Sequence, residues 1–129
     1  MSHFAGDVDT ILLVEDDTAV RQSLHRLLKK AGYLILATAD PDHACELLND
    51  CAIHALVLDV RLPNNRSGLE VLGRARAQRK TAALLAIILT GVDLSAEEER
   101  SIRDHGAHLF RKPANIHELI LFLDARLQR

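Results

Sequence analysis

The sequence is poor in aromatic residues and in cysteine. Phe, Trp and Tyr together make up 3% of its 129 residues, and tryptophan is absent. The core must therefore be aliphatic, and 48% of the residues are hydrophobic. Cys45 and Cys51 are the only cysteines, and they form neither a Cys-x-x-Cys motif nor the Cys and His spacing of a zinc site. We expect two reduced thiols and no disulfide framework.

A long apolar run and an excess of one charge are also lacking. No segment approaches the ~20 apolar residues that span a bilayer. The first residues lack the basic-then-apolar pattern of a secretion signal. A formal net charge of −2 gives no general attraction to nucleic acid or to an anionic membrane. We expect a cytoplasmic protein. We also expect one domain, because a chain of this length buries one core.

Short apolar runs alternate with helical segments along the chain. Asp40 followed by Pro41, Ser95 followed by Glu98, and Asn115 are typical of helix starts. Five β-α units predict an α/β fold with a doubly wound, five-stranded parallel sheet of order 2-1-3-4-5 and five helices, a flavodoxin-like three-layer sandwich. Residues 1–9 are expected to form a flexible tail, and residues 10–129 a single domain. The predicted strands are residues 10–14, 33–38, 54–60, 83–89 and 107–111.

Two helical segments have unusual surfaces. The fourth holds one large apolar residue, Ile102, which predicts a weakly docked and mobile helix. The third carries a run of basic residues, which we interpret as a solvated face because no aromatic residues interleave with them. Those basic residues are Arg74, Arg76, Arg79 and Lys80.

Asp59 lies within the apolar run of the third predicted strand. A buried carboxylate costs several kcal/mol unless something compensates its charge. We therefore place Asp59 at the carboxyl end of that strand, where open α/β sheets bind their ligands. A purely structural role as a turn cap is the alternative, because Asp is common at strand ends.

Polar residues also follow the other strands of the predicted sheet. Glu15 and Asp16 follow the first strand, Thr90 the fourth and Lys112 the fifth. In the predicted topology these ends converge with Asp59 around one crevice. Three carboxylates repel one another unless a cation is present, and Mg²⁺ prefers such oxygen ligands. Lys112 and Thr90 would hold the oxygens of a phosphoryl group, and a carboxylate can act as its nucleophile.

With these motifs the chain resembles the receiver domain of the two-component response regulators, over residues 9–127. The segments that carry the resemblance are Ile11-Leu12-Leu13-Val14-Glu15-Asp16-Asp17, Leu58-Asp59-Val60-Arg61-Leu62-Pro63, Gly68-Leu69-Glu70, Leu89-Thr90-Gly91 and Lys112-Pro113. The resemblance implies Mg²⁺-dependent phosphoryl transfer from a histidine kinase, or a phosphotransfer protein, to Asp59. It also implies a cis bond between Lys112 and Pro113.

The resemblance further assigns roles within the site. Asp16, Asp59 and the backbone carbonyl of Arg61 would bind Mg²⁺ directly, with Glu15 acting through water. Thr90 and Lys112 would stabilise the phosphoryl group. The domain would be no conventional enzyme, although it would have weak self-phosphotransfer and autodephosphorylation activity. Its output would be a conformational change in the face formed by the fourth helix, fifth strand and fifth helix. In the changed conformation this face would bind an output domain or a second copy.

The chain departs from the family pattern at its expected switch. Leu109 stands where the family often has Tyr or Phe, and Phe110 should point the opposite way. The loop from Leu62 to Gly68 is about one residue longer than the common form. On the last helix, Leu121 and Phe122 lie off the core face. They form either a helix edge packed against its neighbours or an exposed partner surface.

The side chain two residues after Asp59 is another point of interest. Arg61 stands there, at a position that tunes the lifetime of the phosphoryl group in the family that the chain resembles. A side chain of this length could lean over the crevice and affect the access of water to it.

Three other functions remain as alternatives. A flavin carrier needs a phosphate-binding loop after the first strand, and the acids at residues 15–17 would repel phosphate. A phosphatase of the haloacid dehalogenase type has its nucleophile in an Asp-x-Asp motif at the first strand. Here the candidate nucleophile Asp59 follows the third predicted strand, and Arg61 stands in place of the second acid. An unphosphorylated receiver acting only as an interaction module would keep the same residues without the chemistry.

Overall fold

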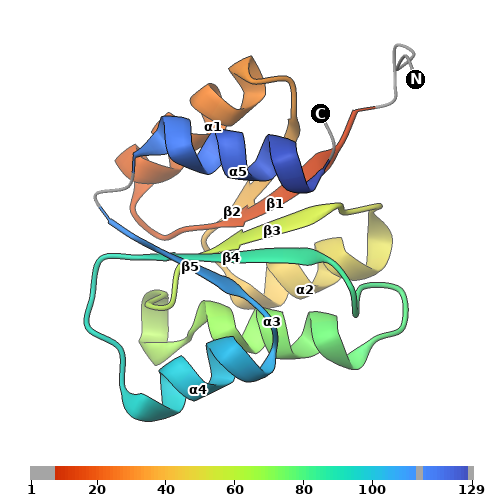
Figure 1. Ribbon diagram of the computed structural model, residues 1–129. Helices are drawn as coiled ribbons and strands as arrows, with labels where there is room; N and C mark the ends of the chain where they lie inside the picture. Colours follow the sequence, from red (N-terminus) through yellow and green to blue (C-terminus); the bar gives the residue numbers. More distant parts are fainter. Residues whose placement is uncertain (1–7, 113–114, 128–129) are drawn as a thin grey trace.

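The computed structural model describes residues 8–112 and 115–127, in which strands and helices alternate along the chain (Figure 1). The elements in chain order are β1 (Thr10–Val14), α1 (Thr18–Lys30), β2 (Leu34–Thr38), α2 (Pro41–Asp50), β3 (Ala55–Leu58), the 3₁₀ turn η1 (Pro63–Asn65), α3 (Gly68–Ala77), β4 (Leu85–Thr90), α4 (Ala96–Asp104), β5 (His108–Arg111) and α5 (Ile116–Arg126).

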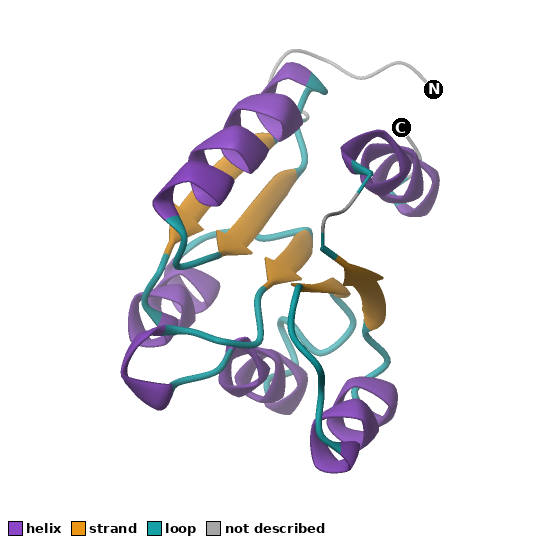
Figure 2. Ribbon diagram, turned by 90° about the vertical axis from the view of Figure 1, so that its left-hand side faces the viewer, coloured by secondary structure: helices purple, strands orange, loops and turns teal. Residues whose placement is uncertain are grey.

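The strands form one parallel sheet in the order β2-β1-β3-β4-β5. Helices α1 and α5 cover one face, and α2, α3 and α4 cover the other (Figure 1). Figure 2 turns the carboxyl ends of the strands toward the viewer and shows the three layers. The predicted fold class and strand order are confirmed. The physical reason for the layers is that apolar strands buried on both faces need a helical layer on each side.

The core lies in two layers, one on each side of the sheet. Alternate residues of a strand point to opposite faces, so Leu12 and Leu56 contact the α2 and α3 side while Ile11 and Val57 contact α1 and α5. These side chains are almost fully buried. The central strands β1, β3 and β4 are therefore largely apolar, and the polar residues of the site begin where these strands end.

Capping side chains fix where the helices begin. The carboxylate of Asp17 accepts a hydrogen bond from Val20 N at the start of α1. Asp40, Ser95 and Asn115 cap α2, α4 and α5, as the sequence predicts. A further capping box, formed by Ser67 and Glu70, starts α3 and is not among the helix starts predicted above.

Some boundaries differ from the sequence-based expectation. The third predicted strand ends at Leu58, so Asp59 lies just past its end, and Thr90 is the last residue of β4. The Lys112-Pro113 bond and most of the expected tail lie outside the described residues. Among the helices that are described, none combines the length and apolar character that crossing a bilayer requires.

One basic residue of the predicted solvated face, Arg76, is only partly exposed. Arg74, Arg79 and Lys80 are exposed as predicted, but the prediction is wrong for Arg76. Its guanidinium donates to the backbone carbonyls of His105 and Leu84, each at 2.7 Å. Arg76 therefore connects the end of α4 to the segment before β4. Removing its guanidinium would leave both carbonyls without this donor. The free energy of unfolding should then fall by more than it does for an ordinary surface substitution.

Gly68 packs against the backbone of Asp59. Its N–H donates to the Asp59 carbonyl at 3.0 Å, and a Cβ at this position would lie 2.0 Å from that oxygen. Only glycine lets α3 begin so close to the end of β3. The start of α3 thus fixes the backbone of the residue on which the predicted chemistry depends.

We predict opposite effects of alanine at two glycines of α3. Gly68→Ala should lower the free energy of unfolding by about 1–3 kcal/mol, because a Cβ there overlaps the Asp59 carbonyl. Gly73→Ala should raise it by about 0.5–1 kcal/mol, because apart from the adjacent residues and the backbone of its own helix no atom lies within 4 Å of the new Cβ. Urea unfolding of both variants measures the difference. Equal stability of the two variants would contradict the close packing of Gly68.

Candidate functional site

Backbone hydrogen bonds continue the sheet past the strand ends and set the site residues side by side. Asp59 N donates to Val14 O at 2.9 Å, and Lys112 N donates to Thr90 O at 2.9 Å. Glu15 N donates to Thr38 O at 3.0 Å. The residues after β1, β3 and β5 therefore hold the register of their strands. This is why side chains far apart in the sequence meet at one edge.

Three carboxylates meet there. One oxygen from each of Glu15, Asp16 and Asp59 lies within 4.8 Å of the others. Glu15 is 1% exposed and Asp59 8% exposed, whereas Asp16 faces solvent. The structure thus brings together all three acids that the sequence singled out. It also separates their neighbour Asp17, whose carboxylate caps α1.

Lys112 compensates the two buried acids. Its Nζ donates to Glu15 Oε1 and, at 3.1 Å, to Asp59 Oδ2. Burial raises the pKa of Glu15 above its ordinary value, although Lys112 and the Asp17 N–H act to lower it. Burial acts to lower the pKa of Lys112, but its bonds to Glu15 and the charge of Asp59 outweigh burial and raise it. The ammonium therefore stays charged between two acids.

Thr90 is fully buried at the end of β4. Its hydroxyl lies 3.4 Å from Val92 N, which donates to it. The next residue, Gly91, is small, and a Cβ there would lie 3.3 Å from Lys112 Cβ. The lysine side chain thus passes directly beside Gly91, and the loop after β4 adjoins the same edge as the carboxylates.

Arg21 supports the acidic pair from α1, a role that sequence reasoning missed. Its Nη1 donates to the carbonyls of Glu15 at 2.9 Å and of Asp16 at 3.4 Å. The helical spacing of α1 identifies Arg21 only as a polar residue, because nothing in the sequence indicates which carbonyls its side chain reaches.

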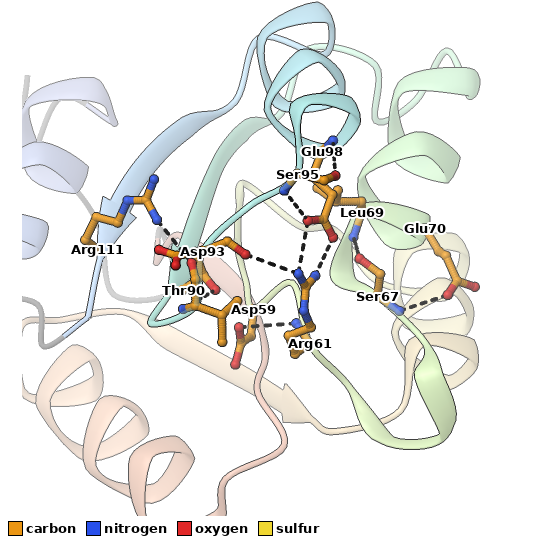
Figure 3. A network of polar contacts seen from close by, with 11 residues as sticks. Asp59, Arg61, Ser67, Leu69, Glu70, Thr90, Asp93, Ser95, Glu98 and Arg111 are labelled. Carbon is orange, nitrogen blue, oxygen red and sulfur yellow. Dashed lines mark hydrogen bonds and ion pairs between the residues drawn. The ribbon is translucent and has the colours of Figure 1, made fainter.

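The loop after β3 contains Arg61, whose backbone N–H lies 3.4 Å from Asp59 Oδ1. Its side chain does not lean over the carboxylates but extends toward α4 (Figure 3). The loop contains the turn η1, in which Asn64 and Asn65 have φ angles of 61° and 58°. Asparagine tolerates this left-handed conformation better than most residues.

The residues of the expected output face are distributed over both sides of the sheet. Leu109 is 37% exposed and Leu121 is 54% exposed. Phe110 points to the opposite side of β5, where its ring packs edge-on against Phe122 at a centroid distance of 5.4 Å. Phe122 also packs against His108. Leu121 is therefore the exposed member of the pair, while Phe122 belongs to an aromatic cluster between β5 and α5.

The donor set fits a divalent cation. Three negative charges meet at the site, and the ammonium of Lys112 balances one of them. The donors are all carboxylate oxygens, which are the ligands that Mg²⁺ prefers. Asp16 keeps its carboxylate in solvent, where an ion could enter. The described residues thus offer both the charge and the ligand type that such an ion needs.

Comparison with known proteins agrees with this geometry. The family model of the response regulator receiver domain matches residues 11–124. Response regulator MprA of Mycobacterium ulcerans is 38% identical over 120 residues, which are 92% of this chain and 50% of that protein. The chain therefore spans about half the length of the curated relatives it matches.

Solved structures show the same likeness. A CheY-like response regulator receiver domain from Methanospirillum hungatei superposes with a TM-score of 0.86 at 26% identity, covering 95% of each chain. The receiver domain of a sensor histidine kinase from Pseudomonas aeruginosa gives a TM-score of 0.80 at 27% identity, covering 92% of this chain and 96% of that one. That structure has a magnesium ion coordinated in its active-site cleft.

Receiver domains bind Mg²⁺ in their active sites and work with histidine kinases in signalling, without being conventional enzymes. The sheet order, the acids after β1 and β3 and the lysine after β5 are all present in this chain. The family model covers nearly all of it. This chain therefore belongs to the receiver domains of the two-component response regulators.

Proposed function

We propose that Asp59 is the phosphoryl acceptor of this domain. The observation that carries the proposal is the position of its carboxylate. It lies at the end of the central strand β3, with Lys112 on one oxygen and the Arg61 N–H near the other. Glu15 and Asp16 follow the neighbouring strand β1, and Thr90 ends the strand β4 on the other side. Asp59 is thus the acid that every other group of the site surrounds.

The reaction moves a phosphoryl group from a kinase histidine to this carboxylate. One oxygen of Asp59 forms a bond to phosphorus as the N–P bond of the phospho-imidazole breaks. The electron pair returns to the ring nitrogen, which takes up a proton. The Lys112 ammonium would move partly away from Glu15 and Asp59 and neutralise one phosphoryl oxygen. The Thr90 hydroxyl would donate a hydrogen bond to another phosphoryl oxygen. Positioning and charge neutralisation supply most of the rate.

Asp16, Asp59 and the backbone carbonyl of Arg61 would hold Mg²⁺, with Glu15 reaching it through water. When bound, the ion neutralises charge that develops on the phosphoryl oxygens. Arg21 keeps the carbonyls of Glu15 and Asp16 in place, so both acids stay oriented toward the site. A small donor such as acetyl phosphate would serve in place of the kinase, and the acyl phosphate would later hydrolyse within the domain.

The α4-β5-α5 face would pass the signal to an output domain or a second copy, with Leu109 and Leu121 as exposed apolar contacts. A cytoplasmic location is part of the proposal, since response regulators meet their kinases there. The flavin alternative is disfavoured by the carboxylates that follow β1, because they would repel a phosphate. An inert receiver is disfavoured because three acids and the lysine meet at one edge of the sheet, with Thr90 at the end of the adjoining strand.

We predict that the domain incubated with Mg²⁺ and acetyl phosphate gains the mass of one phosphoryl group. Asp59→Asn should abolish the gain, because the amide is a far weaker nucleophile than the carboxylate. Intact-protein mass spectrometry measures it, with circular dichroism showing that the variant is folded. A folded wild-type protein that gains no mass would overturn the proposed function.

Two neighbouring acids offer a matched test of the metal ligands. Asp16→Asn should raise the Mg²⁺ concentration needed for half-maximal phosphorylation by at least about tenfold, since a carboxylate ligand is lost. Asp17→Asn removes the same charge one residue later and retains the cap, because Asn caps helices as well as Asp. It should stay within about twofold of wild type. Equal effects of the two changes would argue against Asp16 as a ligand.

Lys112 and the cation should substitute for each other in stabilising the fold. In Lys112→Ala, Glu15 and Asp59 lose their counter-charge, and the free energy of unfolding should fall by about 2 kcal/mol without metal. MgCl₂ should then stabilise the variant more than the wild type, because the ion relieves a larger repulsion. Thermal unfolding with and without MgCl₂ measures this. Lys80→Ala is the control, because the Lys80 ammonium donates to the Asn49 carbonyl away from the site.

A further inference from the structure

The side chain of Arg61 connects the phosphorylation loop to α4. Its guanidinium donates to both carboxylate oxygens of Glu98, with the Nη2–Oε1 distance at 3.0 Å, and to the Asp93 carbonyl at 3.3 Å. The backbone N–H of the same residue lies beside Asp59 Oδ1. Figure 3 shows the guanidinium between the loop that leaves Asp59 and the first turn of α4. One residue therefore contacts both the proposed acceptor and the helix of the expected output face.

The first turn of α4 has few other attachments. Within the described part of α4, Ile102 is the one buried residue, and it lies in the second half of the helix. The far end is held by Arg76, which donates to the His105 carbonyl. At the near end, Glu98 caps the helix through Ser95 N and receives Arg61. This end is thus attached by the pair that Arg61 forms with Glu98 and, just before the cap, by Leu94, which packs against the apolar core.

The pair is stable to protonation but open to competition by another anion. The hydrogen bonds from Arg61 lower the pKa of Glu98 to about 2, so its carboxylate is ionised at neutral pH and well below it. Glu98 first, and the charge of Asp59 to a smaller degree, raise the pKa of Arg61, so the guanidinium already lies within the field of Asp59. An acyl phosphate on Asp59 adds about one further negative charge at that position.

We propose that Arg61 is an electrostatic latch that holds the start of α4 in the unphosphorylated domain and releases it when the phosphoryl group on Asp59 draws the guanidinium away from Glu98. The release step rests on the proposed function, whereas the latch in the unphosphorylated domain does not. The device supplies a link from Asp59 to α4 that does not need an aromatic side chain at Leu109. It also explains why Arg61 turns toward α4 and not over the carboxylates.

The test compares Glu98→Gln with Glu97→Gln. The amide introduced by Glu98→Gln retains an oxygen for Ser95 N but loses the charge that binds Arg61, whereas Glu97 is an exposed acid of the same turn with no ion pair among the described residues. Hydrogen exchange is followed at Glu99 N, the first amide of α4 that donates to a backbone carbonyl, that of Ser95. Without phosphodonor, Glu98→Gln should exchange there about threefold faster than wild type, and Glu97→Gln at nearly the wild-type rate.

Acetyl phosphate and Mg²⁺ are then added, and phosphorylation is followed by intact mass in parallel. Exchange at the start of α4 should rise in the wild type and in Glu97→Gln, and stay unchanged in Glu98→Gln, where the latch is already open. An equal rise in all three, or equal exchange in all three before phosphorylation, would overturn the latch. A wild-type protein that gains no mass would overturn the proposed function and the release step, while the unphosphorylated comparison would still decide whether the ion pair holds α4.

Discussion

The ammonium of Lys112 lies between two carboxylates that the sheet buries, and the rest of the site depends on that compensation. Glu15 and Asp59 end two neighbouring apolar strands, so neither can turn into water without breaking the ladder that continues past them. Two buried carboxylates with oxygens within 4.8 Å of each other would repel by several kcal/mol without a cation. The fifth strand supplies that cation, and so ties the outer part of the sheet to the chemistry at its centre.

Much of the fold and most of the site follow from the sequence because both depend on local pattern. Apolar runs and capping residues predict the strands and most helix starts, and the βαβ handedness then leaves few strand orders. Once the order is known, the carboxyl ends of β1, β3 and β4 must meet, which places Glu15, Asp59 and Thr90 together. Composition alone could not have shown this, because each of these residues is ordinary by itself.

The remaining contacts join segments that the local pattern does not relate. From the sequence, Arg61 could lean over the crevice, but Glu98 lies 37 positions away along the chain and captures it. The sequence predicts a solvated side chain for Arg76, yet its guanidinium donates hydrogen bonds to backbone carbonyls of two other segments. Long, flexible arginine side chains reach several alternative partners, and only the folded arrangement selects among them. The need for glycine at position 68 likewise appears only when α3 meets the Asp59 backbone.

The two ends of α4 are attached by interactions of different physical kinds. At its start the attachment is an ion pair between Arg61 and Glu98, with the arginine side chain about half exposed to solvent. At its end, Arg76 is half-buried and bonds to backbone carbonyls, which dissolved ions weaken far less. Opening of the proposed latch would leave α4 attached near His105, so the motion would be a tilt of the amino end about the carboxyl end. Because dissolved ions screen the Arg61–Glu98 pair, the ionic strength of the surroundings would set how readily that end moves.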